Sequence, residues 1–166
     1  VSSSKYFLEL CPEFNRVVFY VHEIWESEQT GETYIKSFDI DAAQAKKIKL
    51  LKDSLEINNI PSDKYISGWE HGLDGITYVF ENKKDNNYSF KNYWTPSSQK
   101  TLKEAQNILT YTHQLDAIIE YSAKRKLFES EIPFYGWTYN GSSMAAIRVI
   151  SNTKEYRRYK RMKKRK

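Results

Sequence analysis

Alternation of apolar and polar residues, recurring in four separate segments, most constrains how this chain can fold. The first two segments, residues 16–25 (RVVFYVHEIW) and 33–40 (TYIKSFDI), are separated by a polar stretch that contains Gly31. The other two, residues 76–81 and 88–94, flank a second polar turn. Alternation of this kind is typical of β-strands, and the short polar connections predict two hairpins. The first strand is apolar on both faces, which predicts a central position in its sheet.

Apolar residues at the spacing of an α-helix follow each predicted hairpin. Asp41 and Gln44 match a capping box and precede a stripe of apolar residues, so they predict the start of a helix. After the second hairpin, Thr95 and Pro96 are a favoured helix start, with Thr as N-cap and Pro at the first helical position. We expect a long second helix from there to about Lys126.

Two further segments, residues 134–139 and 144–150, are predicted as strands and complete the order ββα-ββα-ββ, although a short helix is an alternative for the second. Some of the predicted strands are joined by hairpins and others by a helix that leads the chain back. Such connections favour a mostly antiparallel sheet. The sequence therefore predicts an α+β fold with two helices on one face of that sheet. A length of 166 residues fits one domain, which we assign to residues 1–153.

Positive charge is concentrated at the C-terminal end. Of 26 Lys and Arg and 21 acidic residues, nine bases and one acid lie in residues 154–166, so this basic tail carries +8 and the other 153 residues carry −3. The tail could bind nucleic acid or an anionic surface, with Tyr156 and Tyr159 stacking on bases. It could equally be a solvated helix or one docked on the acidic body. The cations of this candidate site are Arg157, Arg158, Lys160, Arg161, Lys163 and Lys164.

Aromatic residues are unusually frequent, at 15% of the chain. Tyr88, Phe90 and Trp94 share one face of the last strand of the second hairpin, because even numbers of residues separate them. This row either packs against the helices as core or faces solvent. In the second case it is a stacking platform for bases, sugar rings or a partner protein.

The densest polar cluster is the glycine-rich segment 68–75 (GWEHGLDG). Glu70, His71 and Asp74 could perform acid–base chemistry or bind a metal, and Trp69 adds a ring that could contact a ligand. A structural interpretation is that the glycines supply positive φ angles where the chain turns into the next strand.

No motif assigns a reaction. The chain has no phosphate-binding glycine loop, no nucleophile elbow and no zinc-protease motif, and the lone Cys11 cannot form an intramolecular disulfide. We therefore expect no cofactor and no metal, and a binding module is favoured over an enzyme. The longest apolar run, residues 17–21, is too short to span a bilayer, so no membrane span is expected.

Residues 72–78 (GLDGITY), residues 93–96 (YWTP) and the ending Ile150-Ser151-Asn152 before the basic run resemble a family of uncharacterised exported proteins of Gram-negative bacteria. The resemblance covers about residues 70–160. It implies a periplasmic or secreted protein with a small α+β domain, and it implies no assigned activity.

Three hypotheses for the function stay open. The favoured one is a non-catalytic binding or inhibitory module that acts through the aromatic hairpin and the 68–75 loop, on an unknown protein or small-molecule ligand. The second is a nucleic-acid-binding protein that uses the basic tail. The third is a hydrolase or metal-dependent enzyme centred on Glu70, His71 and Asp74.

Overall fold

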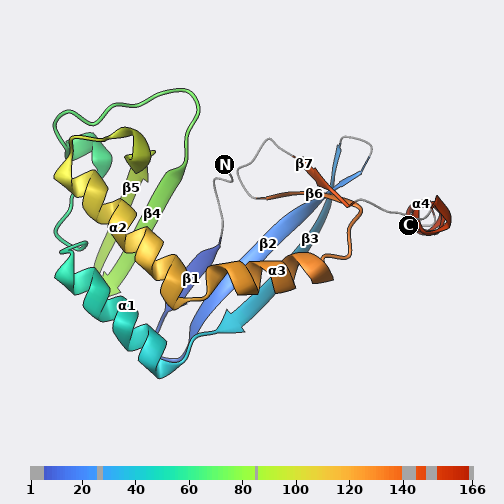
Figure 1. Cartoon of the computed structure of the whole chain (residues 1–166), viewed down its shortest axis with the longest axis horizontal. Helices are drawn as coiled ribbons and strands as arrows, with labels where there is room; N and C mark the ends of the chain where they lie inside the picture. Colours follow the sequence, from blue (N-terminus) through green and yellow to red (C-terminus); the bar gives the residue numbers. More distant parts are fainter. Residues whose placement is uncertain (1–5, 26–27, 85, 140–144, 149–152, 165–166) are drawn as a thin grey trace.

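The computed structural model describes residues 6–25, 28–84, 86–139, 145–148 and 153–164 (Figure 1). Within these ranges the chain is an α+β protein in which every strand pair is antiparallel. The elements in chain order are β1 (Phe7–Leu10), β2 (Asn15–Trp25), β3 (Glu28–Asp39), α1 (Ala42–Ser54), a 3-10 turn (Asp63–Tyr65), β4 (Thr77–Lys84), β5 (Asn87–Trp94), a second 3-10 turn (Pro96–Ser98), α2 (Lys103–Ile118), α3 (Tyr121–Glu131), β6 (Gly136–Tyr139), β7 (Ala145–Ile147) and α4 (Thr153–Lys163).

β2 is the central strand of a five-stranded sheet. β3 pairs along one edge of β2, whereas β1 and β6 pair with its first and second halves on the other edge, and β7 continues beyond β6. Val17, Phe19 and Val21 point to one face of β2 and are at most 1% exposed. The predicted central position of this strand is therefore confirmed.

β4 and β5 form a separate two-stranded sheet. Their pairing runs from Thr77 opposite Trp94 to Lys84 opposite Asn87. The second predicted hairpin is thus confirmed, with longer strands than the alternating pattern indicated. Polar residues at its tip continue the backbone pairing, which needs no apolar side chains.

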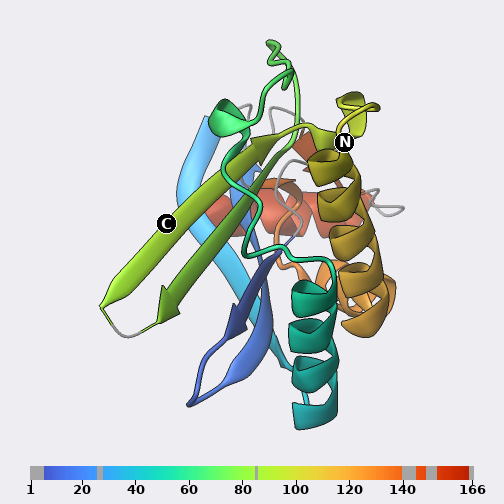
Figure 2. The same cartoon turned by 90° about the vertical axis from the view of Figure 1, so that its left-hand side faces the viewer.

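Helices α1, α2 and α3 lie on the same side of the strands (Figure 2). α1 begins at the predicted capping box, because the Asp41 carboxylate accepts from the Gln44 N–H at 2.7 Å and the Gln44 side chain accepts from the Asp41 N–H. α3 covers the large sheet, where Phe128 packs on Phe19 and Tyr34 with ring centroids 5.5 Å apart in both pairs. The α+β class is confirmed, whereas the predicted two-helix ββα-ββα-ββ order is not matched.

The single long helix predicted to start at Thr95 is wrong. Thr95 has a left-handed backbone with φ +40°, and its hydroxyl accepts the Ile76 N–H at 2.9 Å instead of capping a helix. Only a 3-10 turn follows before α2 begins at Lys103. A second interruption at Glu120, with φ +55°, divides the remaining helical segment into α2 and α3.

Candidate functional site

The β4–β5 hairpin has one packed face and one exposed face. Phe80 and Tyr93 turn toward the helices, and their ring centroids lie 5.5 Å apart. Val79, Tyr88 and Phe90 point the other way and are 51%, 61% and 55% exposed. In the predicted aromatic row, Tyr88 and Phe90 are therefore surface residues rather than core.

The large sheet also has a side opposite to α1, α2 and α3 (Figure 2), and that side carries exposed apolar residues. Phe7 stacks on Tyr20 with ring centroids 5.3 Å apart, and Ile35 lies opposite Tyr20 on β3. Phe7 and Ile35 are 48% and 61% exposed. We call five exposed apolar residues on β1, β3 and the hairpin the outer face: Phe7, Ile35, Val79, Tyr88 and Phe90. Large apolar side chains gathered on one side are typical of an interaction site.

Trp94 differs from the rest of the predicted row because the glycine-rich loop covers it. A Cβ added to Gly72 would lie 2.8 Å from the Trp94 ring, and one added to Gly75 would lie 2.0 Å from the Thr95 hydroxyl oxygen. In this loop only Gly68 has a positive φ, of +80°. The expectation that positive φ explains these glycines is therefore corrected, because Gly72 and Gly75 are required for close approach.

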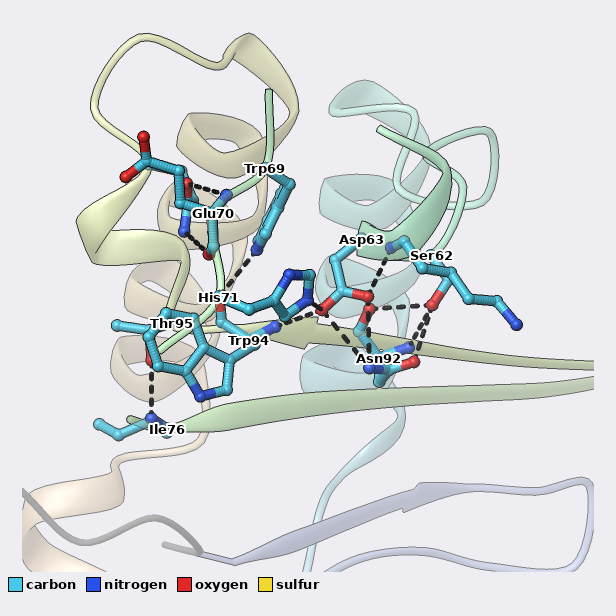
Figure 3. A network of polar contacts seen from close by, with 11 residues as sticks. Ser62, Asp63, Trp69, Glu70, His71, Ile76, Asn92, Trp94 and Thr95 are labelled. Carbon is cyan, nitrogen blue, oxygen red and sulfur yellow. Dashed lines mark hydrogen bonds and ion pairs between the residues drawn. The ribbon is translucent and has the colours of Figure 1, made fainter. Parts of the chain in front are cut away.

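The loop is fastened to the end of the hairpin by two polar contacts (Figure 3). The buried Trp69 donates its indole N–H to the Trp94 carbonyl at 2.9 Å. The buried Gln99 side chain pairs with the Glu70 backbone, accepting from its N–H at 3.1 Å and donating to its carbonyl at 2.7 Å. Trp69 and Gln99 therefore hold the loop in place rather than present themselves to a ligand.

Asp63 is a buried carboxylate that the sequence analysis missed. It is 1% exposed and accepts hydrogen bonds from the Trp94 N–H at 2.7 Å and the Asn92 side-chain amide at 3.3 Å. The Ser62 hydroxyl accepts the Asn92 N–H at 3.1 Å, so the two side chains close the C-terminal end of the outer edge of β5. Local sequence patterns do not reveal this carboxylate, because Asp63 lies 31 residues before Trp94.

Glu70, His71 and Asp74 do not converge on one site. The His71 ring turns to Asp63, with Nε2 3.2 Å from the carboxylate, whereas the Glu70 carboxylate points away (Figure 3). Asp74 is exposed. In the described part of the chain, no group of three His, Cys, Asp or Glu side chains could hold a metal ion. The acid–base or metal cluster considered for this loop is not observed.

The basic tail forms α4, and one side of this helix docks on the protein. The Tyr156 and Tyr159 rings contact Trp25, with centroids 6.3 and 5.4 Å from it, and both also contact Tyr135. Residues three apart share one side of a helix. These two rings therefore pack against the protein and are not free to stack on bases.

Glu23 lies buried at the contact with α4. Its carboxylate accepts hydrogen bonds from Thr30 at 2.6 Å and from Tyr159, and it forms an ion pair with Lys163. Lys163 also lies 3.3 Å from Glu32. Burial raises the pKa of Glu23, but the bonds from Lys163, Thr30 and Tyr159 outweigh it and lower that pKa below its ordinary value. The docked helix is thus the arrangement that the structure shows for the tail.

The other side of α4 presents cations to solvent. Lys163 is engaged by the two glutamates, and Lys160 is half-buried. The remaining predicted cations are exposed, namely Arg157, Arg158, Arg161 and Lys164. The predicted anionic-surface site therefore keeps most of its charge but loses its stacking rings.

A cleft of about 1070 Å³ separates the two sheets. Its walls are the strands β1 and β4, and α2 lines it from residue 109 to residue 116. No sequence pattern indicated this cleft, because its walls come from strands about 70 residues apart that meet only in the folded protein.

Comparison of the sequence with protein-family models, with curated proteins and with solved structures finds no match. Along the part of the chain described by the structure, no helix is long and apolar enough to cross a membrane.

Proposed function

We propose that the protein is a non-catalytic binding module that docks a partner protein on the outer face. The observation that carries this proposal is the exposure of Val79, Tyr88 and Phe90 on one face of the hairpin, together with that of Phe7 and Ile35 on the large sheet. Burying one such side chain in an interface contributes about 1.5–3 kcal/mol of hydrophobic stabilisation. Aromatic residues of this kind are enriched among those that dominate binding energy.

The 68–75 loop forms a rim of the proposed surface. Trp94 lies on the same face of β5 as Phe90, and the loop packs over its ring, so the loop borders the outer face. Leu73 is fully exposed there, and the His71 side chain is half exposed. Because contacts from buried side chains hold the loop, little conformational entropy is lost when a partner binds.

Site-specific photo-crosslinking in the source cells tests the proposal. A photoreactive phenylalanine at position 90 should give an adduct with one polypeptide. The same group at Lys126, exposed on the helical side, should not. The change Val79→Asp should abolish the position-90 adduct by placing a charge in the contact. Equal adducts from both positions would contradict docking on the outer face. Fractionation of the same cells tests the expected export.

A second candidate function is binding of nucleic acid or another polyanion by α4. The observation that favours it is the row Arg157, Arg161 and Lys164, whose spacing of four and three residues places the cations on one side of the helix. Each phosphate contact adds affinity that falls with salt.

A titration of duplex DNA and of anionic vesicles at low and high salt tests this second candidate. The suitable variant changes Arg157, Arg161 and Lys164 to Gln, because removing the whole tail would also strip Glu23 of Tyr159 and Lys163. Salt-sensitive binding that the triple change removes would support the candidate. Binding that the triple change leaves intact would contradict it.

A further inference from the structure

Two strand edges face each other across the cleft. β1 pairs only with β2, and β4 pairs only with β5, among the residues that the structure describes. Both strands line the same cleft, and Figure 1 shows β1 lying between β4 and β2. The order across the molecule is therefore β5, β4, cleft, β1, β2, β3.

The pairing register shows which backbone groups of β4 face the cleft. The Thr95 N–H donates to the Ile76 carbonyl at 2.7 Å, so Ile76 directs its backbone groups toward β5. Backbone direction alternates along a strand. Residues 77, 79 and 81 therefore direct their N–H and C=O groups away from β5 and toward the cleft.

The same alternation shows that the end of β5 is protected, whereas the edge of β4 is not. On β5, the N–H groups of residues 88, 90, 92 and 94 point outward. Those of Asn92 and Trp94 donate to Ser62 and Asp63. The corresponding groups of β4 border an open cleft. An edge of this kind is a template for another strand.

The pairing register of β1 shows that this strand, like β4, directs backbone groups into the cleft. The Ile40 N–H donates to the Asn15 carbonyl at 2.9 Å, so Asn15 directs its backbone groups toward β3. Its neighbour Arg16 then faces β1, and the partner of Arg16 is Glu9. Leu8 and Leu10, which flank Glu9, therefore direct their backbone groups into the cleft.

The strand directions are also compatible with one more strand. β1 and β4 run the same way in both views (Figures 1 and 2). A strand that ran opposite to both would join the hairpin and the large sheet into one continuous antiparallel sheet.

We propose that this cleft binds an extended segment of a partner polypeptide, which inserts antiparallel to β1 and β4. The inference rests on the proposed function, because the inserted strand belongs to the partner that docks on the outer face. Main-chain hydrogen bonds from two edges would supply affinity, and alternate side chains would supply specificity. The class of ligand follows from the two rows of backbone donors and acceptors, which match a strand.

The residues that line the cleft determine which side chains the inserted segment needs. On the helical side, it meets Leu8, Phe80, Tyr111 and Leu115, so apolar residues are required at alternate positions. On the other side, its remaining residues lie between Phe7 and Val79 and extend the outer face.

Lys52 adds a charge requirement to the segment. It lines the cleft and is half-buried, and no hydrogen bond or ion pair to its ammonium is found among the described residues. Burial lowers its pKa, because the charged form loses hydration, and the attraction of the neighbouring Asp53 offsets only part of this shift. A carboxylate on the inserted segment would supply a further counter-charge inside the cleft.

Selection of peptides from a random twelve-residue phage library on the full chain provides the probe. The most enriched peptide should alternate apolar residues and carry an acidic one. In the wild type, hydrogen exchange should show that this peptide protects the amides of residues 8, 10, 79 and 81. Lys52→Ala should weaken its binding.

Two proline variants test the backbone contacts. Thr77→Pro removes an N–H that faces the cleft and leaves the outer-face side chains unchanged, and should weaken peptide binding about tenfold, the equivalent of one lost hydrogen bond at 1.4 kcal/mol. The matched control is Ser37→Pro, which removes an outward N–H from the free edge of β3 and should change binding less than about twofold. Circular dichroism verifies that both variants are folded.

The outcomes separate this inference from the proposed function. Failure to enrich any peptide, equal binding to both proline variants, or protection of other amides would overturn strand insertion. The position-90 adduct could still form, and docking on the outer face would stand. Self-association that protects these four amides would identify a second copy as the occupant and overturn a separate partner.

Discussion

The Asp63 carboxylate accepts the Trp94 N–H at 2.7 Å and so closes the edge of β5. Replacing Asp63 with Ala should lower the free energy of unfolding by about 3 kcal/mol, because buried donors lose their acceptor. Urea denaturation measures this change. Asp74→Ala, which removes an exposed acid in the next loop, should stay within about 0.5 kcal/mol. Equal losses would show that Asp63 has no special role at the strand edge.

The two faces of the hairpin should respond differently to the same truncation. Phe80→Ala should cost about 3 kcal/mol of folding free energy, because it opens a gap beside Tyr93 and Tyr111. Phe90→Ala should cost less than about 0.5 kcal/mol, because that ring is already exposed. Thermal denaturation of the two variants compares them directly. A larger loss at Phe90 would reverse the assignment of the faces.

Glycine substitutions test whether close approach or backbone conformation matters in the 68–75 loop. Gly75→Ala should destabilise the protein by about 2 kcal/mol, because the new methyl group would overlap Thr95 and Trp94. In Gly31→Ala, the new methyl group has no atom within 4 Å. The only loss of folding free energy is about 1 kcal/mol, for an alanine in a left-handed backbone at φ +82°. Chemical denaturation gives both values. If the two substitutions cost the same, the packing of the loop on Trp94 is not tight.

Docking of α4 should weaken at acidic pH. The folded protein lowers the pKa of Glu23, so the carboxylate binds protons more weakly in the folded than in the unfolded chain. Its contribution to stability is present above the ordinary glutamate pKa of about 4.3 and is lost as pH falls through the lower folded value.

Fluorescence of Trp25, which contacts Tyr159, should report this release of α4. The other three tryptophans make a Trp25→Phe reference protein necessary. Glu23→Gln should remove this part of the pH dependence, since the amide does not titrate. A transition unchanged in Glu23→Gln would assign the acid sensitivity to another group.

Local patterns in the sequence indicated β2 to β7, the first helix and the α+β class, whereas β1 (Phe7–Leu10) was not predicted. Residues 16–25 alternate with apolar side chains on both faces, and this alone indicates a strand between two neighbours. The Asp41–Gln44 capping box also depends on residues three apart, so it forms wherever that segment is helical. Such interactions are encoded within a few residues, which is why the sequence reveals them.

Tertiary contacts decided the helix boundaries. Thr95 is a residue type favoured at N-caps, but its hydroxyl accepts a hydrogen bond from the Ile76 N–H, just before β4. The side chain of Gln99, four residues further on, forms hydrogen bonds with the backbone N–H and carbonyl of Glu70. Competing partners from distant segments overrode the local preference.

Tertiary structure also decided which candidate residues reach solvent. The even spacing of Tyr88, Phe90 and Trp94 places them on one face of β5, but alternation cannot say whether helices or solvent lie against that face. Folding exposes Tyr88 and Phe90 and covers Trp94 with a loop. The buried Asp63, the docking of Lys163 on Glu23 and the cleft between β1 and β4 all join segments far apart in the chain. Because burial and hydrogen-bond partners depend on the whole fold, residue spacing alone did not reveal them.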